Sequence, residues 1–141
     1  MEFTRRDTLA LGLGAAVLSV LPIRAAKAAA TTDELIAEFT GGAALADSGV
    51  TLTAPEIAEN GNTVPIDVAA PGASAIMVLA TGNPTPPVAT FNFGPLAASQ
   101  AASTRIRLAK TQDLIAIAKL ADGSFAKASA TVKVTIGGCG G

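Results

Sequence analysis

The fold of this chain is constrained most by a series of short stretches that either alternate between apolar and polar residues or are apolar throughout. The seven stretches are Val50–Leu52, Val64–Val68, Ala75–Leu79, Phe91–Phe93, Thr104–Leu108, Leu114–Ala118 and Thr131–Ile136. Residues typical of turns separate them, as at Pro71–Gly72 and Asp122–Gly123. Ala75–Leu79 is apolar throughout, which is typical of a strand buried on both faces. This pattern predicts an antiparallel β-sandwich of the immunoglobulin type, which we assign to residues 49–136.

Residues 29–48 are expected to form a short docking helix and a linker before the sandwich. Thr32–Phe39 is predicted to be helical because Thr32 can cap the first turn and Gly41–Gly42 can end the last one. The apolar face of this helix consists of Leu35, Ile36 and Phe39. So short a helix is not stable alone in water, so we expect this face to dock on the sandwich.

The first 28 residues have the organisation of an export signal. Arg5-Arg6 precedes the apolar stretch Leu9–Leu21, and Ala26–Ala28 is a small-x-small cleavage site. The apolar stretch has about 13 residues, fewer than the roughly 20 that a membrane-spanning helix needs. The paired arginines favour the twin-arginine route, although Thr8 stands where Phe is usual, and Sec export is the alternative. We therefore predict a twin-arginine-type signal peptide at 1–28 and a periplasmic location for the remainder.

The composition of the remainder excludes several classes of function. Of the 10 basic and 11 acidic residues of the chain, four basic and two acidic lie within 1–28, which leaves a net charge of about −3. The sequence has neither a basic surface for nucleic acid nor a second apolar stretch for a membrane. It contains no histidine and a single cysteine, which excludes a Cys–His dyad, a zinc site, a CxxC pair and an internal disulfide. We expect no catalytic residue, metal or cofactor.

The chain ends in Gly137, Gly138, Cys139, Gly140 and Gly141. Paired glycines near a terminus lose much entropy on ordering, so we expect these residues to form a flexible arm, although most single cysteines are small buried residues. Five residues span at most about 17 Å when extended and about 12 Å as a Gly-rich coil. The arm could therefore carry the thiol into the active-site cleft of another protein.

This ending, with two internal stretches, resembles the SoxY family of sulfur carriers in periplasmic thiosulfate oxidation. The internal stretches are Pro55–Pro65 and Thr104–Gln112. The resemblance implies the immunoglobulin-like fold and makes Cys139 the point of covalent attachment for thiosulfate-derived sulfur. It also implies a heterodimer with a SoxZ subunit. The other implied partners are a c-type cytochrome, a sulfate-releasing hydrolase and a sulfur dehydrogenase, and the carrier itself is not an enzyme.

Two other classes of protein remain open at this stage. Ubiquitin-like sulfur carriers also end in Gly-Gly, but they hold sulfur on the last glycine and need activation by ATP, which does not suit the periplasm. A structural protein could instead use Cys139 for an intermolecular disulfide, since exposed thiols form disulfides in oxidising compartments.

Two further features have a functional and a structural interpretation. Arg105 and Arg107 leave one face of a strand and could bind an oxidised sulfur group, but such a pair is more often the solvated side of a half-buried strand. The core is rich in small residues and lacks Trp and Tyr, so we expect a partner subunit to cover an apolar face. Candidates for that face are Ile76, Phe91 and Phe93.

Overall fold

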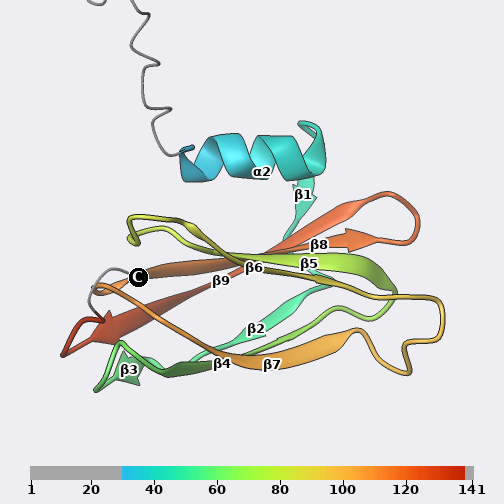
Figure 1. Cartoon of the computed structure of the whole chain (residues 1–141). Coiled ribbons are helices and arrows are strands. Elements are labelled where there is room, and N and C mark those ends of the chain that lie inside the picture. Colours follow the sequence, from blue (N-terminus) through green and yellow to red (C-terminus); the bar gives the residue numbers. More distant parts are fainter. Residues whose placement is uncertain (1–29, 139–141) are drawn as a thin grey trace, which may run out of the picture.

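The computed structural model describes residues 30–138, which form three layers (Figure 1). Helix α2 (Thr32–Thr40) lies on the outer face of the larger of two β-sheets, and the smaller sheet covers the opposite face. The predicted β-sandwich with a short N-terminal helix is confirmed. The predicted signal peptide at 1–28 and the arm residues Cys139, Gly140 and Gly141 lie outside the described residues.

The larger sheet has six strands and the smaller one has three. The larger sheet runs in the order β1 (Leu45–Ala46), β9 (Phe125–Val134), β8 (Gln112–Leu120), β5 (Ala73–Ala80) and β6 (Pro87–Asn92), and β3 (Ile57–Ala58) also pairs with β9. The smaller sheet runs in the order β2 (Thr51–Thr53), β4 (Val64–Ala69) and β7 (Ala101–Ile106). All pairs are antiparallel except those of β1 and β3, which lie parallel to β9.

Each of the seven predicted strands overlaps an observed one, and the sequence analysis missed β1 and β3. These two strands have two residues each, too few for an alternating pattern to be visible. Both pair with β9, one with its first residues and the other with its last. Strand β1 lies within the segment that we expected to be a linker.

The main core lies between the two sheets. In β4, Val64, Ile66 and Val68 are buried while the residues between them are exposed, as expected for a strand with one solvated face. Strand β5 is buried on both faces: Ile76 and Val78 join this core, and Met77 and Leu79 join a second cluster under the helix. The predicted double burial of Ala75–Leu79 is thus largely confirmed.

Of the three candidates for a partner-covered face, Ile76 is excluded by its burial. Ile76 is completely buried in the core between the sheets, and Phe91 and Phe93 are half-buried against the same core. A partner subunit therefore cannot cover Ile76, whereas Phe91 and Phe93 keep part of their surface exposed.

The helix is held at both ends and along its apolar face. Thr31, not the predicted Thr32, is the N-cap: its hydroxyl accepts from Glu34 N at 3.3 Å, and its own N donates to Glu34 Oε2 at 2.8 Å. Gly41 ends the helix with a φ of 64°. The expected docking is confirmed, because Leu35, Ile36 and Phe39 pack on the second cluster, and the Phe39 ring meets Phe125 edge to face at 6.0 Å.

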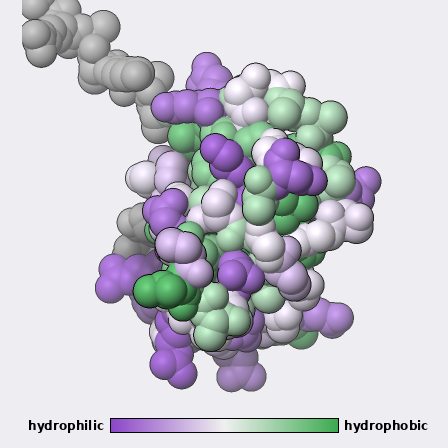
Figure 2. All heavy atoms as spheres, turned by 90° about the vertical axis from the view of Figure 1, so that its right-hand side faces the viewer, coloured by the Kyte–Doolittle hydropathy of each residue, from purple (hydrophilic) through white to green (hydrophobic). Residues whose placement is uncertain are grey.

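The surface shows no segregation of residue types at the end of the sandwich seen in Figure 2, where hydrophilic and hydrophobic residues are interspersed. One large apolar side chain, Leu96 on the β6–β7 connection, is 97% exposed. Within residues 30–138, no helix has the length and apolar character needed to cross a membrane.

Candidate functional site

The residues that lead into the predicted arm lie along the β3–β4 connection, residues 59–63. Strand β9 ends beside β3 (Figure 1), and Thr135 continues the pairing by donating its N to Ala58 O at 3.0 Å. Its hydroxyl also donates to Glu59 O at 3.0 Å. In the next contact the donor belongs to the β3–β4 connection, since Gly61 N donates to Ile136 O at 2.7 Å. The chain is therefore fixed on this side as far as Ile136.

The β7–β8 connection, residues 107–111, borders the other side of the same segment. Gly138 N donates to Leu108 O at 2.9 Å, and Leu108 N donates to Gly61 O at 2.7 Å. The two connections are thus bonded to each other as well as to the segment between them. We call Ile136–Gly138 the arm root. Both Gly138 and Gly61 are buried, although Gly138 is only three residues from the end of the sequence.

Three glycines permit this close approach of backbones. A Cβ on Gly61 would overlap with Leu108 O and lie 2.8 Å from Gly138 N. A Cβ on Gly137 would overlap with Ala109 O, and one on Gly138 would lie 3.0 Å from Gly61 O. Real Cβ atoms essentially never come within 3.0 Å of another atom, so the arm root fits only because Gly61 and Gly137 lack side chains, while a Cβ on Gly138 would be tight.

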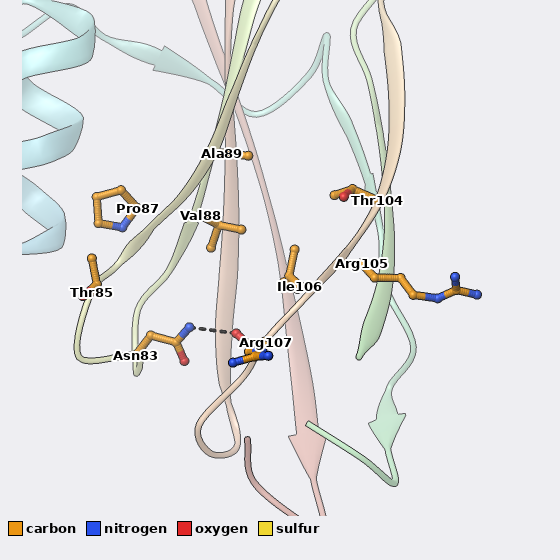
Figure 3. A pocket seen from close by; sticks show the side chains of 9 residues that line it. All are labelled: Asn83, Thr85, Pro87, Val88, Ala89, Thr104, Arg105, Ile106 and Arg107. Atoms are coloured by element: carbon orange, nitrogen blue, oxygen red, sulfur yellow. Dashed lines mark hydrogen bonds between the residues drawn. The ribbon is translucent and has the colours of Figure 1, made fainter. Parts of the chain in front are cut away.

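A buried polar network supports the β7–β8 connection from beneath. Asn83 Nδ2 donates to Arg107 O at 2.8 Å (Figure 3), and Asn83 Oδ1 accepts from Ala109 N at 2.9 Å and from Gln112 Nε2 at 2.8 Å. Gln112 Oε1 in turn accepts from Gly82 N at 2.8 Å. Among the described residues, no buried side-chain nitrogen or oxygen lacks a partner. The loop that holds the arm root therefore has a rigid support.

The two arginines lie beside a cleft of about 410 Å³ between the edges of β6 and β7. Apolar side chains of Val88 and Ile106 line its inner part, and the Arg105 guanidinium extends away from them (Figure 3). Arg105 and Arg107 are exposed while Ile106 is buried, as in a strand with one solvated face. The two guanidinium groups do not point at one another across the cleft in Figure 3. The arrangement favours the solvated strand over an anion site.

Residues 30–138 offer few other groups that could bind a metal ion or take part in catalysis. They contain no group of three or more His, Cys, Asp or Glu side chains that could hold a metal ion. The hydroxyl and N of Ser124 donate to Asp122 at 2.5 and 2.8 Å, and these bonds lower the pKa of that carboxyl. Asp122 lies in the β8–β9 turn, at the opposite end of the strands from the arm root.

Of the predicted site residues, Gly137 and Gly138 are described and lie in the arm root; Cys139, Gly140 and Gly141 lie outside the described residues. The flexibility of the arm stays a prediction. The two internal stretches of the family resemblance, Pro55–Pro65 and Thr104–Gln112, supply the two connections that border the root. The sequence analysis assigned no role to Gly61, Leu108, Asn83 or Gln112, which become neighbours only in the folded chain.

Several solved structures share the fold at low sequence identity. A superoxide reductase (neelaredoxin) from Ignicoccus hospitalis is 21% identical, with a TM-score of 0.53 over 62% of this chain and 80% of that chain. A putative superoxide reductase from Thermotoga maritima is 18% identical, with a TM-score of 0.50 over 60% and 84%. These likenesses concern the fold alone. No curated protein is significantly similar in sequence.

A closer likeness is found with the structure of the sulfur carrier protein SoxY from Chlorobium limicola f. thiosulfatophilum. It is 38% identical, with a TM-score of 0.65, and the match covers 74% of this chain and 96% of that chain. In addition, the profile of the family described as sulfur oxidation protein SoxY matches residues 36–139. That range contains the second half of the helix, both sheets and the arm root, and it extends to Cys139. The chain therefore belongs to the SoxY family of sulfur oxidation proteins.

Proposed function

We propose that this protein carries thiosulfate-derived sulfur covalently on Cys139 and presents it to partner enzymes during thiosulfate oxidation. The observation that carries the proposal is that the single cysteine follows, in sequence, directly after the arm root, which is bonded to two connections of the sandwich. The absence of histidine and of a second cysteine leaves the chain without a histidine base or a redox pair of cysteines, which supports a carrier that depends on its partners for catalysis.

The loading step joins the Cys139 sulfur to the outer sulfur of thiosulfate. A new sulfur–sulfur bond forms, the thiol loses its proton, and two electrons leave. A c-type cytochrome partner accepts these electrons, because nothing in this chain can. The product is a cysteine S-thiosulfonate, which keeps one negative charge on its terminal sulfonate group.

Three further steps restore the free thiol of the carrier. Water attacks the terminal sulfonate sulfur in a hydrolase partner, the sulfur–sulfur bond to that group breaks, and sulfate leaves with the thiosulfate oxygens plus one from water. The remaining persulfide is then oxidised by a sulfur dehydrogenase, which transfers oxygen from three waters and removes six electrons and six protons. A second hydrolysis releases the resulting sulfonate as sulfate and restores the thiol.

The carrier would work in the periplasm as a heterodimer with a SoxZ subunit. The twin-arginine-type signal at 1–28 supports this location, since that route exports folded proteins and could carry a bound subunit with them. The core of small aliphatic residues supports the need for a second subunit, because such residues bury little area each. Purification of the mature chain expressed alone as a stable, folded monomer would contradict the subunit requirement.

The test of the carrier role is a strain with Cys139→Ser. We expect it to lose thiosulfate oxidation, while a strain with Gly94→Ala, a surface position with open space around it, keeps the normal rate. Mass spectrometry of the protein from thiosulfate-grown cells should find sulfur adducts on the C-terminal peptide. Normal thiosulfate oxidation by the Cys139→Ser strain would refute the proposal. A permanent disulfide-linked species on a nonreducing gel, without small adducts, would favour the cross-linking alternative.

A further inference from the structure

Gly61 lies in the β3–β4 connection, outside the glycine-rich tail, yet its surroundings make sense only with the tail in place. Five glycines of the described chain have positive φ angles, and Gly61 is not among them. Any L-residue could adopt its backbone angles, so the need for glycine is one of space. The space that a Cβ would take is occupied by Leu108 O, Gly138 N and Val134 Cγ1.

The arm root is held by a closed set of bonds. Gly61 donates to Ile136 and accepts from Leu108, and Leu108 accepts from Gly138. The β3–β4 connection, the β7–β8 connection and the arm root are therefore each bonded to the other two. Ala109 O closes the remaining side against Gly137. The support beneath is the Asn83 side chain, which accepts from Ala109 N at 2.9 Å. We call Gly61, Leu108 and Ala109 the clasp.

We infer that Gly61 is a positioning residue for the carrier thiol: the clasp holds the arm root through Gly138, so that Cys139 leaves the body of the protein at a fixed point. This inference rests on the proposed function for its purpose, although the clasp itself consists of described residues. While the clasp is closed, the thiol-bearing residue follows the last held residue directly, one Cα-to-Cα step of about 3.8 Å away. When it opens, the free segment begins after Thr135, which stays bonded to Ala58 and Glu59, and the four residues to Cys139 can extend by about 14 Å.

The clasp therefore gives the arm two lengths. The short length leaves the thiol few conformations to lose on binding, which suits a partner enzyme whose active site lies near its surface. The long one is reached only by breaking the hydrogen bonds of the arm root, each of which contributes modestly, so an enzyme that draws the arm in could open it. Backbone bonds and close packing with no side chain to rearrange suit a contact that must close repeatedly.

Amide hydrogen exchange in the full chain tests the clasp directly. We expect the Gly138 amide to exchange at least about 100-fold more slowly than in an unstructured peptide, because it is buried and bonded to Leu108 O. In Gly61→Ala its exchange should become at least about tenfold faster, since the added methyl group displaces the root. Amides in β5 and β8 should keep their protection. An unprotected Gly138 amide in the unaltered chain would overturn the inference.

Two further variants separate the clasp from general stability. Gly137→Ala places a methyl group against Ala109 O but lies beyond β9, so the root can leave the clasp without unfolding the sheets. It should also speed Gly138 exchange about tenfold. Gly94→Ala, with nothing within 4 Å of the added atom, is the matched control and should change nothing. Unchanged protection in both Gly61→Ala and Gly137→Ala would overturn the inference.

Thiol chemistry gives a readout that a merely structural role of Gly61 would not move. We expect the rate of Cys139 alkylation by a bulky maleimide, relative to that by iodoacetamide, to rise about threefold or more in Gly61→Ala and Gly137→Ala, since a longer arm relieves steric hindrance. An unchanged ratio in both variants would count against the clasp. If Cys139 carried no sulfur adduct in cells, the proposed function would fail while these exchange and alkylation results would stand.

Discussion

At the arm root, Gly61 and Gly137 lie where a Cβ would overlap with a backbone carbonyl oxygen, whereas at the other end of the sandwich Gly72 and Gly123 have open space around them and φ angles of 79° and 84°. The first pair lets separate segments of backbone approach one another. The second pair lets the chain reverse in the β4–β5 and β8–β9 turns. One end of the molecule is thus packed around the arm root, whereas the glycines at the other end only allow tight turns between strands.

The polar contacts of the two ends differ in the same way. At the arm root, Asn83 and Gln112 are 8% and 7% exposed and bond to backbone groups of the loop above them. At the opposite end, Gln100 Oε1 accepts from Gly72 N at 3.3 Å at an exposed site. A bond in contact with water is easily replaced by one to water, whereas a buried group that loses its partner stays unsatisfied. Substitution of a hydrogen-bonding side chain should therefore destabilise the protein more at the end that holds the arm.

The largest effect is expected from Asn83→Ala. This change leaves Ala109 N and Gln112 Nε2 short of an acceptor in a buried site, and we expect a loss of about 3 kcal/mol in the free energy of unfolding. Gln100→Ala at the opposite end should cost less than about 1 kcal/mol. Urea denaturation of both variants measures the difference. Equal losses in the two variants would contradict the contrast between the ends.

A smaller effect distinguishes the two kinds of glycine. Gly123→Ala should cost about 1 kcal/mol because of its positive φ, and Gly123→Asn should cost less, since Asn tolerates that conformation. Gly61→Ala should cost about 2 kcal/mol from overpacking, and Gly61→Asn should cost at least as much because its side chain is larger. Stability measurements on the four variants decide between the two causes. Relief by Asn at position 61 would show that the backbone angle, not space, requires glycine there.

The sequence predicted the sandwich because its seven longer strands are either alternating or continuously apolar and are separated by turn residues, and it predicted the docking of the helix from three apolar residues on one face. It could not predict β1 and β3, which exist only as partners of β9. The residues Asn60-Gly61-Asn62 are typical of a turn, but their sequence does not show why glycine is needed at the centre. That reason depends on residues 61, 108 and 138 meeting in space, and no local pattern encodes such a meeting.

For a related reason, the sequence could not show on which side of the sheet Ile76, Phe91 and Phe93 lie. Alternation shows that Phe91 and Phe93 share a side of β6 and its extension, but it does not show which side faces the other sheet. The side is set by the register of β6 against β5, where Phe91 pairs with the buried Ile76. The candidate arm was recognised from its composition alone, whereas its attachment to the body required the fold.

The smallest effect concerns the end remote from the arm. The Ser124 hydroxyl and N lower the pKa of Asp122, so the ionised carboxylate stabilises the β8–β9 turn. Because the pKa is lower in the folded chain, this contribution is present above the pKa of the unfolded chain and is lost as pH falls through the folded value. In Ser124→Ala, the NMR titration midpoint of Asp122 should rise toward the ordinary aspartate value. The variant should be slightly less stable than the unaltered chain at neutral pH and equally stable in acid.

Ser129→Ala, at an exposed position within β9, is the matched control and should leave the Asp122 midpoint unchanged. Neither serine variant should alter the exchange of the Gly138 amide, because distant sites without shared partners act independently. If Ser124→Ala did speed Gly138 exchange, the two ends would be coupled through β9, which runs from the turn to the arm root. Strand β9 is hydrogen-bonded along eight residue pairs to β8, and this long pairing is the physical reason to expect that a disturbed turn stays local.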